Sequence, residues 1–354
     1  MRVYLCPKKE KISDYFIFGL RLQSNHPIPW LVASEEVTMA PDVKVWLGEK
    51  PPWLNEILRE PKHLCSTSPY LDDYGESVYK VWGLAGGIYV QFQYSDGTEF
   101  WVDRLSTEIW ATWSNSTTIE DTMTYLIGPV LGFVLQLRGT LSLHGSAISV
   151  GDQAIGFVGP AGAGKSTLAA AFARQGYPVL SEDILPVFEK HNALFIGTGY
   201  PYVCLWPDTV KSLFGSSNAL PRLTPTEGKY ASWDKRYLSL TKDGYPFKRQ
   251  TYPLGMIYLL GERSNDSKEP LIEPLPPTDG LMALMANLYA GYLLDEGMHA
   301  QAFRLLGRLV ALVTIRRVSI PANLSCLPRI CGRLVDDIHT WVTTPTDFNK
   351  AYII

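Results

Sequence analysis

A glycine-rich loop, Gly-Pro-Ala-Gly-Ala-Gly-Lys-Ser-Thr at residues 159–167, constrains the fold of this chain more than any other feature. An apolar segment at residues 154–158 precedes the loop, and an alanine-rich helical pattern at residues 165–174 follows it. A strand, a glycine loop and a helix in that order turn successive backbone N–H groups toward a phosphate. The start of the helix adds the positive end of its dipole. The loop therefore predicts an α/β fold with a phosphate site.

The G-x-x-x-x-G-K-S pattern of the loop is complete, and it predicts a nucleoside triphosphate, with Mg²⁺ and ATP as the expected cofactors. Lys165 would bring its positive charge to the β- and γ-phosphates, and the Ser166 hydroxyl would be a ligand of Mg²⁺. The residues expected to contact the nucleotide are Gly159, Pro160, Ala161, Gly162, Ala163, Gly164, Lys165, Ser166 and Thr167.

Two adjacent acids, Glu182 and Asp183, follow a short apolar strand pattern at residues 177–180. They lie 17 and 18 residues beyond Lys165, at the carboxyl end of the predicted strand. Ligands bind at that edge of an open parallel sheet. One acid there can hold Mg²⁺, and the other can accept a proton from an attacking hydroxyl. Both are candidate catalytic residues.

The net charge of −3 and the absence of a basic stripe argue against nucleic-acid binding. Five scattered cysteines without a C-x-x-C pair argue against a disulfide framework and a zinc site, and fit a reducing cytosol. The N-terminus lacks the apolar core of a signal peptide, and glycine and proline break the apolar stretch at residues 123–137. We therefore expect a soluble cytoplasmic protein that does not enter a membrane.

The pattern of the chain changes near residue 116, which suggests two domains. Residues 1–115 are rich in short apolar and aromatic runs and predict a β-rich domain whose tryptophans mostly fill its core. Thr117 and Glu120 then form a capping-box pattern for a helix that would run to about Arg138, bent at Pro129. We expect residues 116–354 to form the domain that contains the glycine loop.

Strand and helix patterns alternate in the second half, and this supports the α/β class. A strand is expected at residues 256–260 and helices at residues 280–290 and 298–313. Between the acid pair and this strand, residues 197–253 are rich in proline and glycine and show little periodicity. Lys235 and Arg236 lie in that middle segment.

Three parts of this region, residues 144–148, 159–166 and 180–183, resemble the HPr kinase/phosphorylase family. In that family a histidine begins a strand-turn-strand, a P-loop follows, and an acidic pair ends the next strand. The resemblance implies a P-loop kinase core of the HPr kinase type behind a β-rich N-terminal domain. Residues 15–20, 199–201, 205–207 and 235–236 look like the divergent HPr kinase-related proteins.

Some members of that divergent group, the lasso-peptide kinases, phosphorylate a serine of a ribosomal precursor peptide. The resemblance therefore implies phosphoryl transfer from ATP to a serine hydroxyl, with a peptide or small protein as the partner. It implies that Glu182 is the base and Asp183 the metal ligand, or the exchanged assignment. It also implies that His144 lies beside the reacting phosphate, and that Lys235 or Arg236 reaches the phosphates.

This sequence departs from the family at Glu182, where an aspartate is usual. It also lacks the C-terminal signature that accompanies phosphorolysis, so neither a reverse phosphorylase activity nor HPr as the substrate is expected. Three alternatives stay open: a small-molecule kinase acting on an amino acid or a sugar, a catalytically inactive nucleotide-dependent peptide-binding protein, and an enzyme of hydrolysis or nucleotidyl transfer. The sequence does not specify the acceptor, the nucleotide preference or whether the chain forms a homo-oligomer.

Overall fold

The structure is a computed structural model that describes residues 12–34, 40–72, 74–224, 233–261, 263 and 269–343. The chain divides into two compact units, Met1–Val130 and Leu131–Ile354. Sequence patterns placed the boundary between residues 115 and 116, whereas the units meet 15 residues later. Each unit is described by itself.

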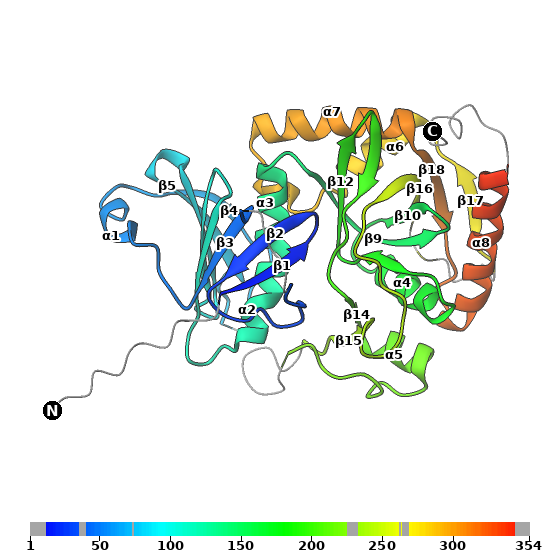
Figure 1. Cartoon of the computed structure of the whole chain (residues 1–354), viewed down its shortest axis with the longest axis horizontal. Coiled ribbons are helices and arrows are strands. Elements are labelled where there is room, and N and C mark those ends of the chain that lie inside the picture. The colour runs from blue at the N-terminus through cyan, green and yellow to red at the C-terminus, as the bar shows by residue number, and fades with distance from the viewer. Residues whose placement is uncertain are drawn as a thin grey trace. The chain divides into compact units, whose positions relative to one another are not determined.

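The first unit is built on an eight-stranded mixed sheet with the order β1-β2-β3-β8-β7-β6-β5-β4 (Figure 1). Its β2–β3 and β3–β8 pairs are parallel and the others antiparallel. The strands are β1 (Ser13–Ile17), β2 (Leu20–Ser24), β3 (Val43–Leu47), β4 (His63–Thr67), β5 (Tyr79–Leu84), β6 (Tyr89–Tyr94), β7 (Glu99–Asp103) and β8 (Glu108–Thr112), with the short helix α1 (Leu54–Ile57) after β3.

Aromatic side chains fill part of this unit's core. Trp101 and Trp110 are only 1% and 4% exposed, and they pack with Leu54 and Leu84. Trp53 lies at the margin of this cluster, where its ring stacks on Tyr89 with centroids 3.7 Å apart. Two of the seven tryptophans in the predicted β-rich domain are therefore fully in the core, and others cover its edge.

The helix that follows the sheet, α2 (Ile119–Tyr125), begins one residue later than the sequence pattern predicted. Thr118, not Thr117, is the N-cap, and it exchanges hydrogen bonds with Asp121 in a capping box. The Thr117 hydroxyl donates to the Asp96 carbonyl. A π-helical turn at Leu126–Val130 contains Pro129, the residue at which a bend was expected, and α3 (Leu131–Leu137) follows.

The second unit contains a seven-stranded path, β10-β9-β12-β13-β16-β18-β17, in which β10 also pairs with β16 (Figure 1). Its strands are β9 (Leu141–Val150), β10 (Gln153–Val158), β11 (Val179–Ser181), β12 (Ile184–Lys190), β13 (Ala193–Ile196), β16 (Tyr252–Leu260), β17 (Leu271–Pro274) and β18 (Thr314–Ser319). A separate pair joins β14 (Tyr202–Leu205) to β15 (Arg236–Ser239).

The extra β10–β16 pairing closes strands β10, β9, β12, β13 and β16 into a ring. Among the strands that the structure describes in this unit, only the β10–β16 and β16–β18 pairs are parallel. The acid pair was placed by assuming an open parallel sheet, and the structure corrects that assumption. The acid pair nevertheless follows the end of β11 in the same sense as the glycine loop follows the end of β10. Both strands are antiparallel to β9 and therefore run in the same direction.

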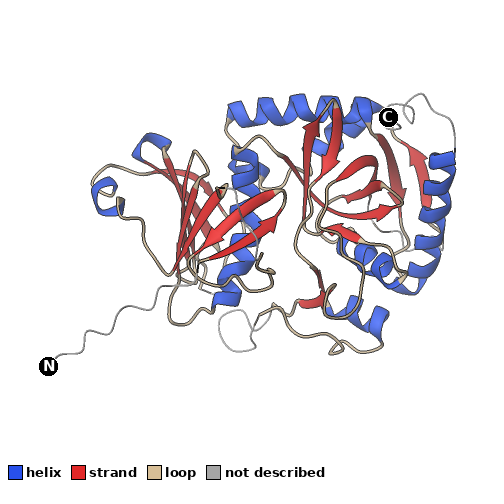
Figure 2. Ribbon diagram, viewed as in Figure 1, coloured by secondary structure: helices blue, strands red, loops and turns tan. Residues whose placement is uncertain are grey.

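Helices cover both faces of this sheet (Figure 2). One core contains side chains of α4 (Lys165–Arg174), α5 (Pro207–Phe214) and α8 (Leu327–Thr343). The other contains side chains of α6 (Pro277–Met285) and α7 (Glu296–Leu312). Side chains on opposite faces of β10 contribute to both cores. Ile155 and Phe157 pack in the first core, and Ala154 and Val158 pack in the second.

The fold is therefore of the mixed α/β class, as expected. The strand, loop and helix around residues 159–167 form as predicted. Helix α5 was missed because it lies in the proline- and glycine-rich middle segment, and α8 was not predicted. Among the described residues, no helix is long and apolar enough to cross a membrane.

The contrast between two phenylalanines of the second unit tests this packing. Phe172 on α4 is fully buried, whereas Phe303 on α7 is 50% exposed. We expect Phe172→Ala to lower the free energy of unfolding by about 3–5 kcal/mol, because it leaves a cavity in the core. The matched Phe303→Ala change should cost less than about 1 kcal/mol. Urea unfolding of both variants measures the difference, and equal losses would contradict the described core.

Candidate active site

The site is organised around Gly145 in the middle of β9. On one side Gly145 is the register partner of Val158, the last residue of β10 before the glycine loop. On the other side its N–H donates to the carbonyl of Asp183 at 3.1 Å. A Cβ at Gly145 would lie 2.8 Å from the Phe157 carbonyl oxygen, so only glycine fits this close approach. The strand thus joins the loop and the acid pair, with His144 beside them.

The glycine loop has the geometry of an anion cradle. Gly164 has a φ of +107°, which a residue with a side chain rarely adopts, and α4 begins directly after it. The Lys165 ammonium donates to the carbonyls of Gly159 and Pro160, both at 2.8 Å. Burial lowers the pKa of Lys165 to about 8. The loop, the helix N-terminus and the lysine therefore fit a bound phosphate chain.

The first acid of the pair, Glu182, lies directly against the loop serine. The Ser166 hydroxyl donates to Glu182 Oε1 at 2.6 Å, and the Tyr200 hydroxyl donates to Oε2 at 2.9 Å. Glu182 is 3% exposed, and burial, with the nearby charge of Asp183, raises its pKa to about 7. Ser166 and Glu182 together present adjacent hard oxygens of the kind that Mg²⁺ prefers.

The second acid, Asp183, points to the other side and has different partners. The Tyr289 hydroxyl donates to Asp183 Oδ2 at 2.6 Å, and His144 Nε2 lies 3.7 Å from Oδ1. Burial lowers the pKa of His144, while the charge of Asp183 works in the opposite direction. Asp183 has a φ of +65°, an uncommon backbone conformation for a non-glycine residue. Such outliers concentrate at functional sites.

Lys235 and Arg236, the two basic residues of the middle segment, have different surroundings in the structure. Lys235 lies at the site: burial works against its charge, but Cys204, Asp183 and Glu182 outweigh burial and raise the pKa of Lys235. Its ammonium is also 5.6 Å from the ring centroid of Trp206.

Arg236 is not brought to this site. Its guanidinium lies 2.7 Å from Asp234 and donates to the Leu220 carbonyl at 3.2 Å. These partners belong to the β14–β15 region rather than to the glycine loop. Of the two residues that were expected to reach the phosphates, only Lys235 is positioned near the acids.

Sequence reasoning missed the two tyrosines that hold the acids. Tyr200 lies within residues 199–201, which carried part of the family resemblance, but no role was assigned to it. Tyr289 follows α6 and reaches Asp183 across 106 residues of sequence. The backbone N–H of Tyr289 donates to the Ser142 carbonyl of β9, which holds its segment beside the site. No spacing pattern predicts such a long-range contact.

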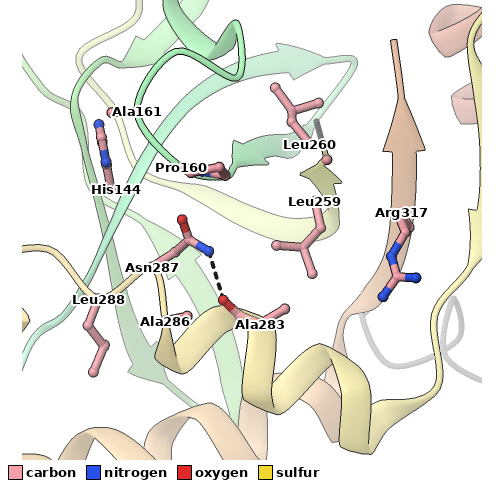
Figure 3. A pocket seen from close by; sticks show the side chains of 11 residues that line it. His144, Pro160, Ala161, Leu259, Leu260, Ala283, Ala286, Asn287, Leu288 and Arg317 are labelled. Atoms are coloured by element: carbon pink, nitrogen blue, oxygen red, sulfur yellow. Dashed lines mark hydrogen bonds between the residues drawn. The ribbon is translucent and has the colours of Figure 1, made fainter. Parts of the chain in front are cut away.

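A cavity of about 570 Å³ opens beside the glycine loop (Figure 3). Its walls come from the loop, the end of β16, helix α6 and β18. The Asn287 amide nitrogen donates to the Ala283 carbonyl at 2.8 Å, as the dashed line in Figure 3 shows. The lining residues are His144, Pro160, Ala161, Leu259, Leu260, Gly261, Ala283, Ala286, Asn287, Leu288 and Arg317.

The chain matches no family model and no curated protein. A solved structure with which it aligns is that of the Hpr(Ser) kinase/phosphatase from Coxiella burnetii. The alignment covers 56% of this chain and 98% of that one, with 13% sequence identity and a TM-score of 0.28. Similarity at this level says nothing about activity, so the chemistry must be inferred from the residues of this chain.

The raised pKa of Glu182 makes a prediction for the ligand-free protein. Since the folded state holds this proton more tightly than a glutamate with the ordinary pKa of 4.5 does, stability should fall as pH rises from about 4.5 to about 7. Glu182→Gln removes the buried charge and should therefore stabilise the fold above that range, by roughly 1–3 kcal/mol. Thermal unfolding with and without the substitution, at both ends of the range, measures this.

The matched control is Asp152→Asn, which neutralises an exposed acid in the turn between β9 and β10. It should change stability equally at both pH values. If Glu182→Gln destabilised the fold most strongly above pH 7, the ionised carboxylate would be stabilising, contrary to this account.

Proposed function

We propose that this chain is an ATP-dependent kinase that transfers the γ-phosphate of Mg·ATP to a serine hydroxyl of a peptide or small protein. One observation carries the proposal: two adjacent acids are divided between two different tasks. Glu182 hydrogen-bonds to the loop serine, Ser166, whereas Asp183 turns toward His144 and Tyr289. Phosphoryl transfer to a hydroxyl needs both a metal ligand and a proton acceptor.

Glu182 and Ser166 are the residues that would hold the metal. This exchanges the first assignment that the resemblance implied, in which Asp183 was the ligand and Glu182 the base. The exchange is supported by the 2.6 Å contact between the Ser166 hydroxyl and the Glu182 carboxylate. Mg²⁺, when bound with ATP, supplies positive charge to the phosphate oxygens. Tyr200 keeps the glutamate oriented through its hydrogen bond to Oε2.

Lys165 and Lys235 would neutralise the triphosphate. In the structure the Lys165 ammonium caps two loop carbonyls, and phosphate oxygens would replace them as stronger, charged acceptors. Lys235 lies close enough to the same acids for their charges to raise its pKa. Positioning and charge neutralisation supply most of the catalysis in this class of reaction.

Asp183 would accept the proton of the attacking serine hydroxyl. As the serine oxygen forms its bond to the γ-phosphorus, the bond from that phosphorus to the β-phosphate oxygen breaks, and ADP leaves. The hydrogen bond from Tyr289 fixes the Asp183 carboxylate, and His144 lies within 3.7 Å of its other oxygen. The carboxylates of Asp183 and Glu182 have different hydrogen-bond partners, so the two acids would act separately.

A small-molecule kinase is the second candidate, and the cavity favours it. Its volume of about 570 Å³ falls in the range of small-ligand sites, roughly 300–1,000 Å³. Figure 3 shows His144 and the loop residue Pro160 among the side chains that line this cavity. An amino acid or another small hydroxyl compound would therefore fit beside the loop as well as a serine within a peptide.

The division of labour between the acids makes a kinetic prediction. Asp183→Asn should lower kcat by about 100- to 10,000-fold, because general-base assistance is lost, with little change in Mg·ATP affinity. Glu182→Gln should instead weaken Mg·ATP binding by about 10- to 100-fold. Calorimetry measures the affinities, and ADP release with serine peptides or water as the acceptor measures turnover.

Two controls accompany this pair of variants. Asp152→Asn, at the opposite end of β10, should change neither quantity. Lys165→Ala should reduce both, because its charge contacts the phosphates before and during transfer. Mass spectrometry of the acceptor must show the gain of one phosphate, and a nucleotide adduct would contradict the kinase assignment. Full turnover by Asp183→Asn would contradict the base assignment.

The pH dependence of nucleotide affinity follows from two shifted groups. Glu182 is charged above its pKa of about 7, and Lys165 is charged below its pKa of about 8. Affinity for Mg·ATP should therefore be highest between these values and fall by up to about tenfold per pH unit on either side. Titration of a fluorescent ATP analogue measures this. The acidic limb should disappear in Glu182→Gln, and its persistence there would show that another group causes it.

A further inference from the structure

Lys235 reaches the acids from a part of the chain outside the main sheet. It directly precedes β15, which pairs with β14 in a separate two-stranded sheet (Figure 1). Leu205 is the register partner of Arg236, so the same register places Trp206 opposite Lys235. The Lys235 ammonium accordingly lies 5.6 Å from the centroid of the Trp206 ring and 5.5 Å from that of Trp233. Its charge thus lies close to two aromatic rings, which favour a cation.

The neighbours of Lys235 in the chain have other partners. Arg236 Nε lies 2.7 Å from Asp234 Oδ1, and Arg236 Nη2 donates to Asp234 Oδ2 at 3.0 Å. Arg222 Nη1 lies 2.6 Å from the same Oδ1. This pattern is expected of an extended segment, in which residues two apart share a face and the residue between them faces the other way. Two arginines therefore hold Asp234, and these three residues are called the Asp234 cluster below.

Backbone hydrogen bonds join the segments that carry the Asp234 cluster. The Leu223 N–H donates to the carbonyl of Lys235 at 2.8 Å, and the Tyr237 N–H donates to the carbonyl of Pro221 at 3.1 Å. Residues 221–223 therefore lie along one edge of β15, and β14 lies along the other. The main chain at Lys235 is held by these bonds, and the ion pairs of the Asp234 cluster connect the same segments through side chains.

The carboxylate of the Asp234 cluster is balanced within the cluster. The side chains of Arg222 and Arg236 are 17% and 12% exposed, and that of Asp234 is 32% exposed. Ion pairs that are partly buried in this way are screened less than exposed pairs. Asp234 therefore attracts the ammonium of the adjacent Lys235 less than an unpaired acid would. Lys235 can then lie near Glu182 and Asp183 instead.

We propose that Asp234 is a positioning residue: held between Arg222 and Arg236, it directs Lys235 toward the phosphates of bound Mg·ATP. The inference rests on the proposed function, because Lys235 has this task only when a triphosphate is bound. A lysine side chain has many rotamers, and ordering them on binding costs free energy. A fixed main chain and a neighbouring acid that is already paired lower this cost, because they leave the lysine fewer competing positions.

A double-mutant cycle between Asp234 and Lys235 tests the proposal. Calorimetry of the full chain measures its affinity for a non-hydrolysable ATP analogue with Mg²⁺, so no acceptor is needed. Lys235→Ala should weaken binding by about 10- to 100-fold, because a charge-assisted contact to the phosphates is lost. Asp234→Asn should weaken binding by about 3- to 30-fold, and it should cause no further loss in the Lys235→Ala background.

The direction of the Asp234→Asn effect separates positioning from simple electrostatics. The substitution removes a negative charge near an anionic ligand, so long-range attraction alone would tighten binding. A weaker affinity that depends on Lys235 would therefore come from the position of the lysine.

Two further variants control for folding and for charge. Asp243→Asn changes an exposed acid beyond the other end of β15, where Asp243 Oδ2 accepts a hydrogen bond from the Ser239 N–H at 3.1 Å. It should leave the affinity unchanged. Arg222→Lys keeps the charge of the Asp234 cluster without the planar guanidinium and should reproduce part of the loss, again only when Lys235 is present. It replaces Asp234→Asn in the cycle if thermal unfolding shows that Asp234→Asn does not fold.

Three results would overturn the inference. They are an unchanged or tighter affinity of the folded Asp234→Asn protein, an equal loss with and without Lys235, and no effect of Lys235→Ala itself. In each of these cases the wild type still binds the analogue with Mg²⁺. Failure of the wild type to bind it is a different outcome, because it would contradict the proposed function.

Discussion

The pairing of β9 with its neighbours at Gly145 is the constraint on which the candidate site depends. On one side it fixes the end of β10, and with it the start of the glycine loop. On the other side it fixes the backbone of Asp183, between β11 and β12. A side chain at position 145 would collide with the Phe157 carbonyl, so the two halves of the site could not approach. Backbone hydrogen bonds of β9 thus bring the start of the glycine loop and the acid pair together.

Glu182 and Asp183, which this arrangement brings together, repel each other when both are charged. Two adjacent carboxylates, one of them almost fully buried, cannot both be charged without cost, and burial raises the pKa of Glu182 to about 7. Tyr200 and Tyr289 each donate one hydrogen bond and thereby separate the acids. Lys165 and Lys235 supply compensating charge. A bound cation would relieve the same repulsion.

The sequence predicted those features that depend on particular residue types close together in the chain. The loop at residues 159–167 and helix α4 could be predicted because each needs particular residue types at fixed spacing. Glu182 and Asp183 were found because they follow an apolar strand, although their partners were not known. Tyr289 could not be predicted, because it reaches the site through a loop after α6. Long-range contacts also separate Lys235 from Arg236, which no local pattern distinguishes. Strand pairing is likewise long-range, so the largely antiparallel ring was expected to be a parallel sheet.

The central claim is that Glu182 serves the metal and Asp183 serves the acceptor. A crystal structure of the protein with Mg²⁺ and a non-hydrolysable ATP analogue tests this claim most directly. The account predicts that Ser166 Oγ and a Glu182 carboxylate oxygen lie around the ion, with Asp183 still hydrogen-bonded to Tyr289 and facing the γ-phosphate. An ion held by Asp183, with Glu182 remaining on Tyr200 alone, would contradict it.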